Sequence, residues 1–98
     1  MALGNRAFSL RGEIDISSVE RLAEVLHPVS ESEGDVILDL QGLEFADSAG
    51  LRELIRCAQR LDERGRLVLR RPTPTLQRFF DVTGLGRIPN VAIETADA

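Results

Sequence analysis

Apolar residues recur along the chain with two different spacings, and each spacing predicts one kind of element. Apolar residues three or four positions apart, the spacing of a helix that buries one face, occupy the stretches 19–26, 51–61 and 76–83. Strands are predicted by weak alternation of apolar and polar residues at 7–11 and by short apolar runs, bounded by turn residues, at 36–40, 67–69 and 91–93. Because strand and helix alternate, we expect an α/β fold with a mostly parallel sheet of about four strands and helices packed on it.

Turn residues predict where several of these elements end. Gly12 is expected to close the first strand in a turn, and Gln41-Gly42 to turn the chain after the second. Pro28 cannot continue a helix comfortably, so the first helix should end near His27 or in the following turn. Gly65 fits a left-handed cap after the second helix.

The second strand and the third helix carry more detailed signals. Val36–Leu40 is a nearly unbroken apolar run, which is the pattern of a strand covered on both faces. Thr73 and Pro74 predict a capped helix start with proline in the first turn, and Gly84 should close that helix.

The composition is that of a globular domain. We expect a single domain over 1–98, with a core at about 6–93 and a short frayed tail at 94–98. The chain is 43% hydrophobic, and no apolar run approaches the roughly eighteen residues of a membrane span. The N-terminus lacks the basic and apolar regions of a secretion signal, so a cytoplasmic location is expected. The single cysteine, Cys57, lies on the flank of the long helix's apolar face.

Charge and reactive residues argue against several functions. The formal net charge is −4, and all 12 basic residues are arginine, without a long basic stretch or an aromatic platform, which argues against nucleic acid. With one histidine, His27, no Cys/His cluster and no glycine-rich phosphate loop, we expect neither an enzyme nor a metal or other cofactor. A triad of Ser48, His27 and an aspartate would need a geometry that nothing in the sequence implies. The expected partner is a protein or a small ligand.

Residues 45–51 join the second strand to the longest amphipathic pattern, which extends to about Asp62. Asp47 and Ser48 both lie at the start of this helix, where either side-chain oxygen could accept hydrogen bonds from first-turn amides. Those amides and the helix dipole also favour negative charge. Ser48 therefore has two interpretations. Local physics favours a helix cap. The other interpretation is a hydroxyl that is accessible to a kinase. Its phosphorylation would add about −1.5 to −2 charges at a position toward which the same amides point.

Four arginines recur every four residues along the same helix, Arg52, Arg56, Arg60 and Arg64. Such a stripe is usually a solvated face, and we assign Arg60 and Arg64 to one. The expected ion pairs are Glu53 with Arg56 and Arg60 with Glu63. Arg52 lies one turn beyond Ser48, where it is placed to meet an acidic partner or to neutralise a phosphoserine. Asp15, on local grounds, is only an acid in a turn.

Four blocks of sequence, in order and at compatible spacing, resemble the STAS domain of bacterial anti-anti-sigma factors, the anti-sigma factor antagonists. The blocks are Gly12–Asp15, Val36–Leu40, Leu43–Leu51 and Arg78–Leu85. This resemblance spans nearly the whole chain and implies a partner switch. In that family the unmodified protein binds an anti-sigma factor that is also a serine kinase, which frees the sigma factor. The kinase phosphorylates the STAS protein, and a phosphoserine phosphatase restores it.

The same resemblance assigns roles to residues. Ser48 falls at the family's phosphorylated serine, and Asp15 at an acid that supports kinase docking. The implied partner-binding residues are Asp15, Asp47, Ala49, Gly50, Leu51, Arg52 and Arg56. Relatives often have a small residue at position 52, so the bulky Arg52 is expected to alter partner choice or partly offset the phosphate. Few residues precede Gly12, so a shortened sheet edge is expected. The implied state is a monomer or weak dimer without a membrane span.

Two other functions remain open from the sequence. The STAS subunit of a lipid-transport ABC system, which clamps the transporter's ATPase, shares the fold and a similar Asp-Ser/Thr-x-Gly motif. The block Phe80–Leu85 favours the sigma-regulating branch over it. A small-ligand or nucleotide-binding STAS module has no dedicated residues behind it.

Overall fold

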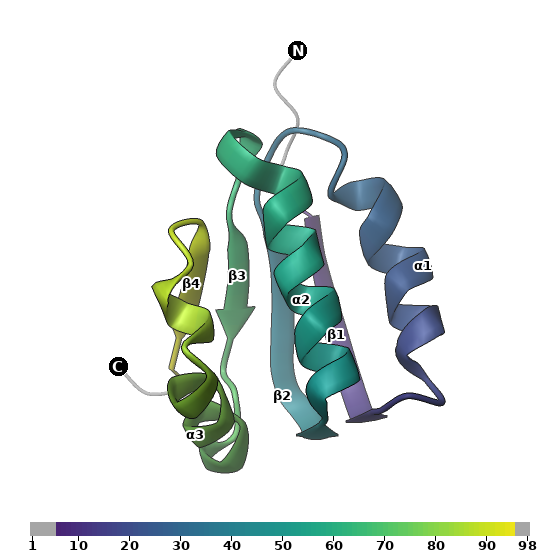
Figure 1. Ribbon diagram of the computed structural model, residues 1–98, viewed down its shortest axis with the longest axis vertical. Coiled ribbons are helices and arrows are strands. Elements are labelled where there is room, and N and C mark those ends of the chain that lie inside the picture. Colours follow the sequence, from purple (N-terminus) through teal and green to yellow (C-terminus); the bar gives the residue numbers. More distant parts are fainter. Residues whose placement is uncertain (1–5, 96–98) are drawn as a thin grey trace.

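The computed structural model describes residues 6–95, over which strands and helices alternate (Figure 1). The elements are β1 (Arg6–Ile14), α1 (Val19–Val29), β2 (Val36–Ala46), α2 (Ser48–Leu61), the 3₁₀ turn η1 (Asp62–Arg64), β3 (Leu67–Arg70), α3 (Pro74–Thr83), the 3₁₀ turn η2 (Leu85–Arg87) and β4 (Val91–Glu94). None of the helices in this range has the length and hydrophobicity needed to cross a bilayer.

The four strands form one sheet in the order β1-β2-β3-β4, and every neighbouring pair is parallel. This confirms the α/β fold with a parallel four-stranded sheet. Figure 1 shows α1 and α2 side by side in front of β1 and β2, with α3 beside them near β3 and β4. Because the strands are parallel, all their carboxyl ends lie at one edge of the sheet, where β2 leads into α2.

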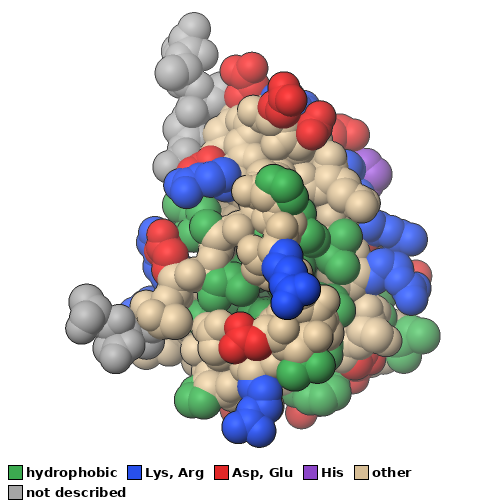
Figure 2. All heavy atoms as spheres, turned by 60° about the vertical axis from the view of Figure 1, so that its left-hand side comes forward, with side chains coloured by type: hydrophobic (Ala, Val, Ile, Leu, Met, Phe, Trp, Pro, Cys, Tyr) green, Lys and Arg blue, Asp and Glu red, His purple; other side chains and the backbone are tan. Residues whose placement is uncertain are grey.

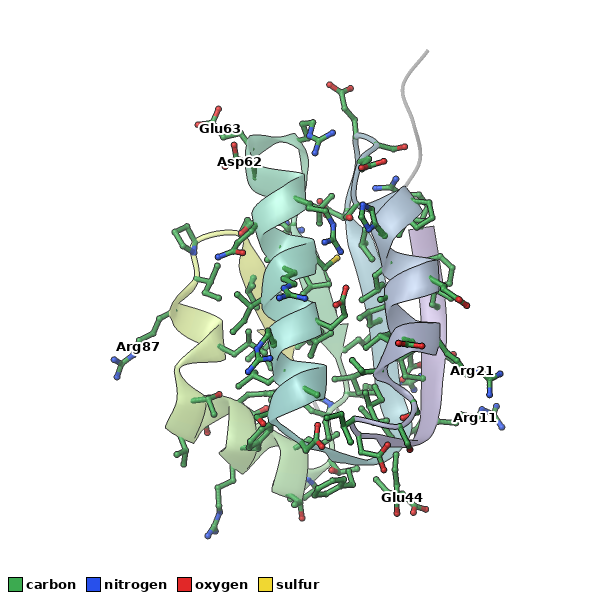
Figure 3. The ribbon with its side chains drawn as sticks, turned by 45° about the vertical axis from the view of Figure 1, so that its right-hand side comes forward. Arg11, Arg21, Glu44, Asp62, Glu63 and Arg87 are labelled. Atoms are coloured by element: carbon green, nitrogen blue, oxygen red, sulfur yellow. The ribbon has the colours of Figure 1, made fainter. Side chains whose placement is uncertain are left out.

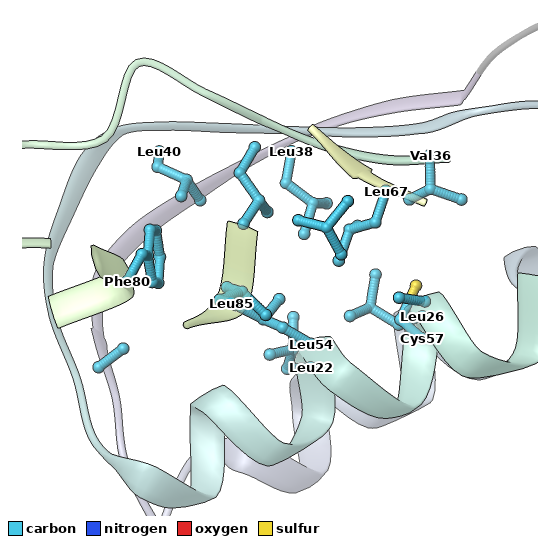
Figure 4. Close-up of a cluster of buried hydrophobic side chains, with 14 of the residues drawn as sticks. Leu22, Leu26, Val36, Leu38, Leu40, Leu54, Cys57, Leu67, Phe80 and Leu85 are labelled. Carbon is cyan, nitrogen blue, oxygen red and sulfur yellow. The ribbon is translucent and has the colours of Figure 1, made fainter. Parts of the chain in front are cut away.

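The hydrophobic core lies on one face of the sheet. Along β2 the inward residues alternate, and Val36, Leu38 and Leu40 are fully buried. Figure 4 shows side chains from the helices packed against them, among them Leu26, Leu54 and Phe80. The intervening Ile37 and Asp39 are only half-buried. The expectation that β2 is covered on both faces is therefore wrong: Ile37 is an apolar residue on the side opposite the core, and it made the run look continuous.

Cys57 is part of this core rather than its flank. The side chain is fully buried. Burial raises the pKa of the Cys57 thiol to about 11, so the thiolate is disfavoured at neutral pH.

Both turns predicted inside the first two strands are wrong. β1 continues through Gly12, which has φ of +76°, and β2 continues through Gln41-Gly42 to Ala46. The two irregular stretches lie opposite each other, with Arg11 paired to Gly42 and a register shift after Gly12. A glycine at positive φ lets a strand absorb a bulge without leaving the sheet, so a signal for a turn marks a distortion here.

The ends of the first two helices differ in how well they were predicted. α1 ends at Val29, with Pro28 in its last turn, inside the expected range. Gly65, however, is extended rather than left-handed, and Asp62 takes the positive φ of 50° instead. Glycine is needed at Gly65 for space, because a Cβ there would lie 2.1 Å from the Gly34 carbonyl oxygen.

The third helix matches its predicted signals. The Thr73 hydroxyl oxygen accepts a hydrogen bond from the Leu76 amide at 3.3 Å, Pro74 is the first helical residue, and Gly84 closes the helix with φ of +77°. Leu85 then folds back into the core. The expected frayed tail is wrong for Glu94, which ends β4 and pairs with Arg70. Its last residues, 96–98, lie outside the described residues, as does any strand within residues 1–5.

Candidate functional site

The start of α2 packs directly on the end of β1. The Asp47 amide donates a hydrogen bond to the Ile14 carbonyl oxygen at 3.1 Å. Gly50 is buried against the same strand end, and a Cβ at this position would lie 2.9 Å from Ile14 Cγ2. Glycine thus permits this close approach. The contact brings the turn after β1, with Asp15, and the first turn of α2, with Ser48, to the same edge of the sheet.

Asp47, not Ser48, caps helix α2. Its Oδ1 accepts hydrogen bonds from the Ala49 amide at 2.9 Å and the Gly50 amide at 3.2 Å. Ser48 is the first helical residue, is exposed, and its hydroxyl has no hydrogen-bond partner among residues 6–95. The interpretation of Ser48 as the cap is therefore wrong. Asp47 already occupies two first-turn amides, so a phosphate on Ser48 would have to compete with this carboxylate for them, and its binding to the same amides stays a prediction.

Asp15 organises the turn between β1 and α1. Its Oδ1 accepts hydrogen bonds from the Ser17 amide at 3.0 Å, the Ser17 hydroxyl at 2.6 Å and the Ser18 amide at 3.2 Å. The side-chain hydrogen bond from Ser17, followed by its backbone hydrogen bond, lowers the pKa of Asp15 below the ordinary value. Ser18 precedes α1 without a side-chain cap. Asp15 therefore supplies the side-chain acceptor in this turn.

The arginine stripe of α2 divides into two halves. Arg52 and Arg56 are exposed and have no hydrogen-bond or ion-pair partner in the part of the chain that the structure describes. Arg60 instead lies between α1 and α2, 3.2 Å from a carboxylate oxygen of Glu53 and 2.8 Å from the hydroxyl of Ser30.

The predicted ion pairs on this helix, and the prediction that Arg60 and Arg64 form a solvated face, are therefore wrong in part. Glu53 is 6% exposed and pairs with Arg60, two turns along the helix, rather than with Arg56. Arg64 is exposed but donates to the Glu31 carbonyl at the end of α1. Packing of α1 against α2 brings the Ser30 hydroxyl to Arg60 and the Glu31 carbonyl oxygen to Arg64, and spacing along α2 alone does not predict these two contacts.

The remaining predicted partner-binding residues differ in exposure. Ala49 and Leu51 are half-buried, and Leu51 packs against the core. Ser48 and Arg52 are the exposed residues of the first two turns of α2. Figure 3 shows Glu44 pointing outward near the same end of the sheet. A protein that approached Ser48 would therefore meet a hydroxyl, an acid and an unpaired cation.

His27 lies far from this group. It is in the last turn of α1, which leads into the amino end of β2, whereas Ser48 follows the carboxyl end of β2. Its Nε2 is 3.4 Å from a carboxylate oxygen of Glu31. The length of β2 thus separates the imidazole from the Ser48 hydroxyl, which excludes a triad of these two residues. Within residues 6–95 no group of three or more His, Cys, Asp or Glu residues has the arrangement to hold a metal ion.

Sequence reasoning missed an apolar hollow beside Ser48. The cavity, about 210 Å³, lies between the end of β2 and α3 and is lined by Phe45, Ala46, Asp47, Thr75, Leu76 and Phe79. Phe45 remains 48% exposed. The signal for it in the sequence is slight: Phe45 is apolar, but alternation from Leu43 would turn it inward, whereas the structure leaves it exposed between the buried Leu43 and Ala46. Which residues of α3 would face it depends on how α3 docks.

Comparison with known proteins gives first a matching family model and then similar proteins and a similar solved structure. The family model described as "Mlab, STAS domain" matches residues 4–93. The putative anti-sigma factor antagonist BtrV of Bordetella bronchiseptica is 35% identical over 85 residues, covering 85% of this chain and 73% of that protein. The anti-sigma-B factor antagonist of Bacillus subtilis is 31% identical over 88 residues, covering 89% and 81%. The crystal structure of an anti-sigma factor antagonist from Mycobacterium paratuberculosis matches with a TM-score of 0.80 and 26% identity, covering 91% and 77%.

The chain therefore belongs to the STAS domain family. Its relatives identify it, within that family, as an anti-sigma factor antagonist. This confirms the resemblance carried by the four sequence blocks. The roles of Ser48 and of its neighbours stay predictions.

Proposed function

We propose that this antagonist is a non-enzymatic partner switch controlled by phosphorylation of Ser48. The unphosphorylated form binds an anti-sigma factor that is also a serine kinase, and this releases the sigma factor. A phosphoserine phosphatase returns the protein to its binding form. The observation that carries the proposal is the exposed Ser48 hydroxyl at the first residue of α2, left out of the helix cap because Asp47 supplies it.

Electrostatics gives a reason for release after phosphorylation. The phosphate would add about −1.5 to −2 charges within one residue of the Asp47 carboxylate. Since Asp47 already accepts from the Ala49 and Gly50 amides, the phosphate would have to compete with this carboxylate for those donors. A docked partner would then have to desolvate two neighbouring anions, which costs binding free energy. The free Arg52 guanidinium, one turn along α2, offsets part of this charge.

The proposed docking surface follows from the family resemblance and from position near the start of α2. It comprises Asp15, Asp47, Ala49, Gly50, Leu51, Arg52 and Arg56. In this set Asp15 acts by holding the Ser17–Ser18 turn in place, and Gly50 by bringing α2 onto β1. Arg52 and Arg56 present unpaired positive charge to acidic groups of the partner.

Phosphorylation of the intact protein tests the proposal. The protein is incubated with ATP and, separately, with each purified serine-kinase anti-sigma factor encoded in the same genome, and its mass is followed. One kinase should add a single phosphate to the wild type and none to Ser48→Ala. Ser9→Ala is the matched control because Ser9 is also exposed, and it should be modified like the wild type. The same phosphate on Ser48→Ala, or none on the wild type, would contradict the switch.

Partner capture separates this proposal from the alternative drawn from sequence. The tagged, unphosphorylated protein should recover an anti-sigma factor from a lysate of its own organism. Recovery of an ABC transporter ATPase without an anti-sigma factor would support the lipid-transport subunit instead. The cytoplasmic location and the monomer or weak dimer remain part of the proposal.

A further inference from the structure

Helix α3 carries an exposed apolar face that leads away from Ser48. Thr75, Phe79 and Val82 are spaced by four and three residues, which places them on one side of the helix. Val82 is 80% exposed. Thr75 and Phe79 also line the 210 Å³ hollow, whose opposite wall is Phe45 at the end of β2. We call Phe45, Thr75, Phe79 and Val82 the α3 groove.

The α3 groove begins at the phosphorylation site. Among residues 6–95, Asp47, the residue before Ser48, is the only charged residue that lines the hollow. Figure 2, which brings the side of the molecule near α3 and β4 forward, shows hydrophobic side chains gathered between basic and acidic ones. Val82 does not line the hollow but lies on the same side of α3 as Phe79, and exposed apolar residues beside charged ones are typical of a protein interaction site.

We infer that the α3 groove receives an apolar side chain of the anti-sigma factor when that protein docks on Ser48. The inference rests on the proposed function and names a second contact for the same partner. A stable complex buries roughly 800 Å² on each partner, with some 20 to 30 residues a side. A kinase that reaches the Ser48 hydroxyl therefore covers the surface around it, and the hollow starts at the adjacent residue.

The groove also explains how one phosphate can release a whole interface. An apolar side chain buried between Phe45 and Phe79 contributes affinity only if water is excluded from the contact. Phosphoserine beside Asp47 holds water at the rim of the hollow, because a dianion keeps its hydration shell unless it is paired. The phosphate on Ser48 would therefore weaken the apolar contact in the hollow, because it lies one residue from Asp47 at the rim.

Two valines provide a matched test. Val82→Arg places a charge in the α3 groove, and Val25→Arg places the same charge on α1, where Val25 is 41% exposed. The dissociation constant of the unphosphorylated protein for the purified anti-sigma kinase is measured by calorimetry. We expect Val82→Arg to weaken binding about tenfold or more, as for loss of a central contact, and Val25→Arg to change it less than about twofold.

Further variants keep the test decisive. Phe45→Ala should also weaken binding about tenfold, and thermal unfolding of each variant checks that it is folded. If the wild type binds and is phosphorylated on Ser48 but Val82→Arg and Phe45→Ala bind within twofold of it, the groove is not a contact and the switch itself survives. Equal losses of affinity in Val82→Arg and Val25→Arg would also show that the α3 groove is not a specific contact. If the wild type neither binds nor is phosphorylated, the proposed function fails.

Discussion

At the scale of single residues, the structure separates two roles that the sequence left joined at Asp47 and Ser48. Aspartate and serine are both good helix caps, and only one of them can occupy the cap position. The Asp47 backbone is extended, with φ of −99° and ψ of −169°, so its carboxylate turns back over the first helical amides. Ser48 is already helical and points its hydroxyl to the surface. An exposed hydroxyl is thereby kept free at little cost to the fold.

This division predicts unequal effects of two alanine substitutions on stability. Asp47→Ala should lower the free energy of unfolding by about 1 kcal/mol, within a range of roughly 0.5 to 2, because two first-turn amides lose their acceptor. Ser48→Ala should change it by less than about 0.5 kcal/mol, because alanine is a good helix former and the hydroxyl makes no contact. Urea unfolding of the two variants and the wild type measures both values. Equal losses would mean that the hydroxyl shares in capping.

At the scale of elements, close backbone contacts between loops decide where chain segments meet. After α2, the turn η1 brings Gly65 against the loop that precedes β2, where the Gly34 amide donates to the Arg64 carbonyl oxygen at 3.1 Å. Asn90 fixes the same turn from the other side, since its side-chain amide donates to the Ala58 carbonyl oxygen at 2.7 Å. These contacts position the amino ends of β2 and β3 side by side.

Gly65 is consequently predicted to be intolerant of any side chain. Gly65→Ala would place Cβ 2.1 Å from the Gly34 carbonyl oxygen, a clash with backbone that no rotamer relieves. We expect it to lower the free energy of unfolding by roughly 1 to 3 kcal/mol or more. Gly86→Ala is the control, because its Cβ would lie 3.2 Å from the flexible end of Ile93 and the cost should be smaller. Thermal or urea unfolding distinguishes them, and equal stability of the two variants would contradict the prediction.

At the scale of the whole molecule, aspartates tie distant segments together through arginines. Asp35 accepts from the Arg66 amide at 2.9 Å, and Asp39 pairs with Arg71 across the sheet. The Arg66 backbone hydrogen bond lowers the pKa of Asp35, and the side-chain hydrogen bond from Arg71 lowers the pKa of Asp39. Because the pKa of each carboxyl group is lowered in the folded protein, the ionised carboxylates stabilise the folded state. Arg71 has a φ of +58°, in the left-handed region.

The direction of these pKa values predicts the acid side of the stability profile. Each carboxyl group has a folded pKa below its unfolded value, so its contribution is complete above the unfolded pKa of about 4. The contribution is lost as the pH falls through the folded pKa. We expect the free energy of unfolding, measured with urea, to decrease as the pH is lowered below about 4. Asp39→Asn should reduce this dependence on pH, and an unchanged profile in that variant would contradict the role of the Arg71 pair.

A feature could be predicted from the sequence when it depends only on residues nearby in the chain. The cap at Thr73, proline at Pro74 and left-handed Gly84 depend on neighbours within one helical turn, and all three were identified correctly. Signals that depend on another segment misled: Gly12 marks a bulge because β2 pairs beside it, and Gly65 is glycine because Gly34 lies against it. Arg60 donates to the Ser30 hydroxyl because the end of α1 lies beside it, which spacing along α2 does not predict.

Periodicity and residues close together in the chain were enough to predict the alternation of strands and helices, the parallel sheet and the position of Ser48 at a helix start. Three further features are visible in the folded protein alone: Asp47 fills the cap, one face of the sheet carries the core, and Phe45 and α3 enclose a hollow beside Ser48. They depend on how segments distant in sequence come into contact, and local spacing carries no record of which segments will meet.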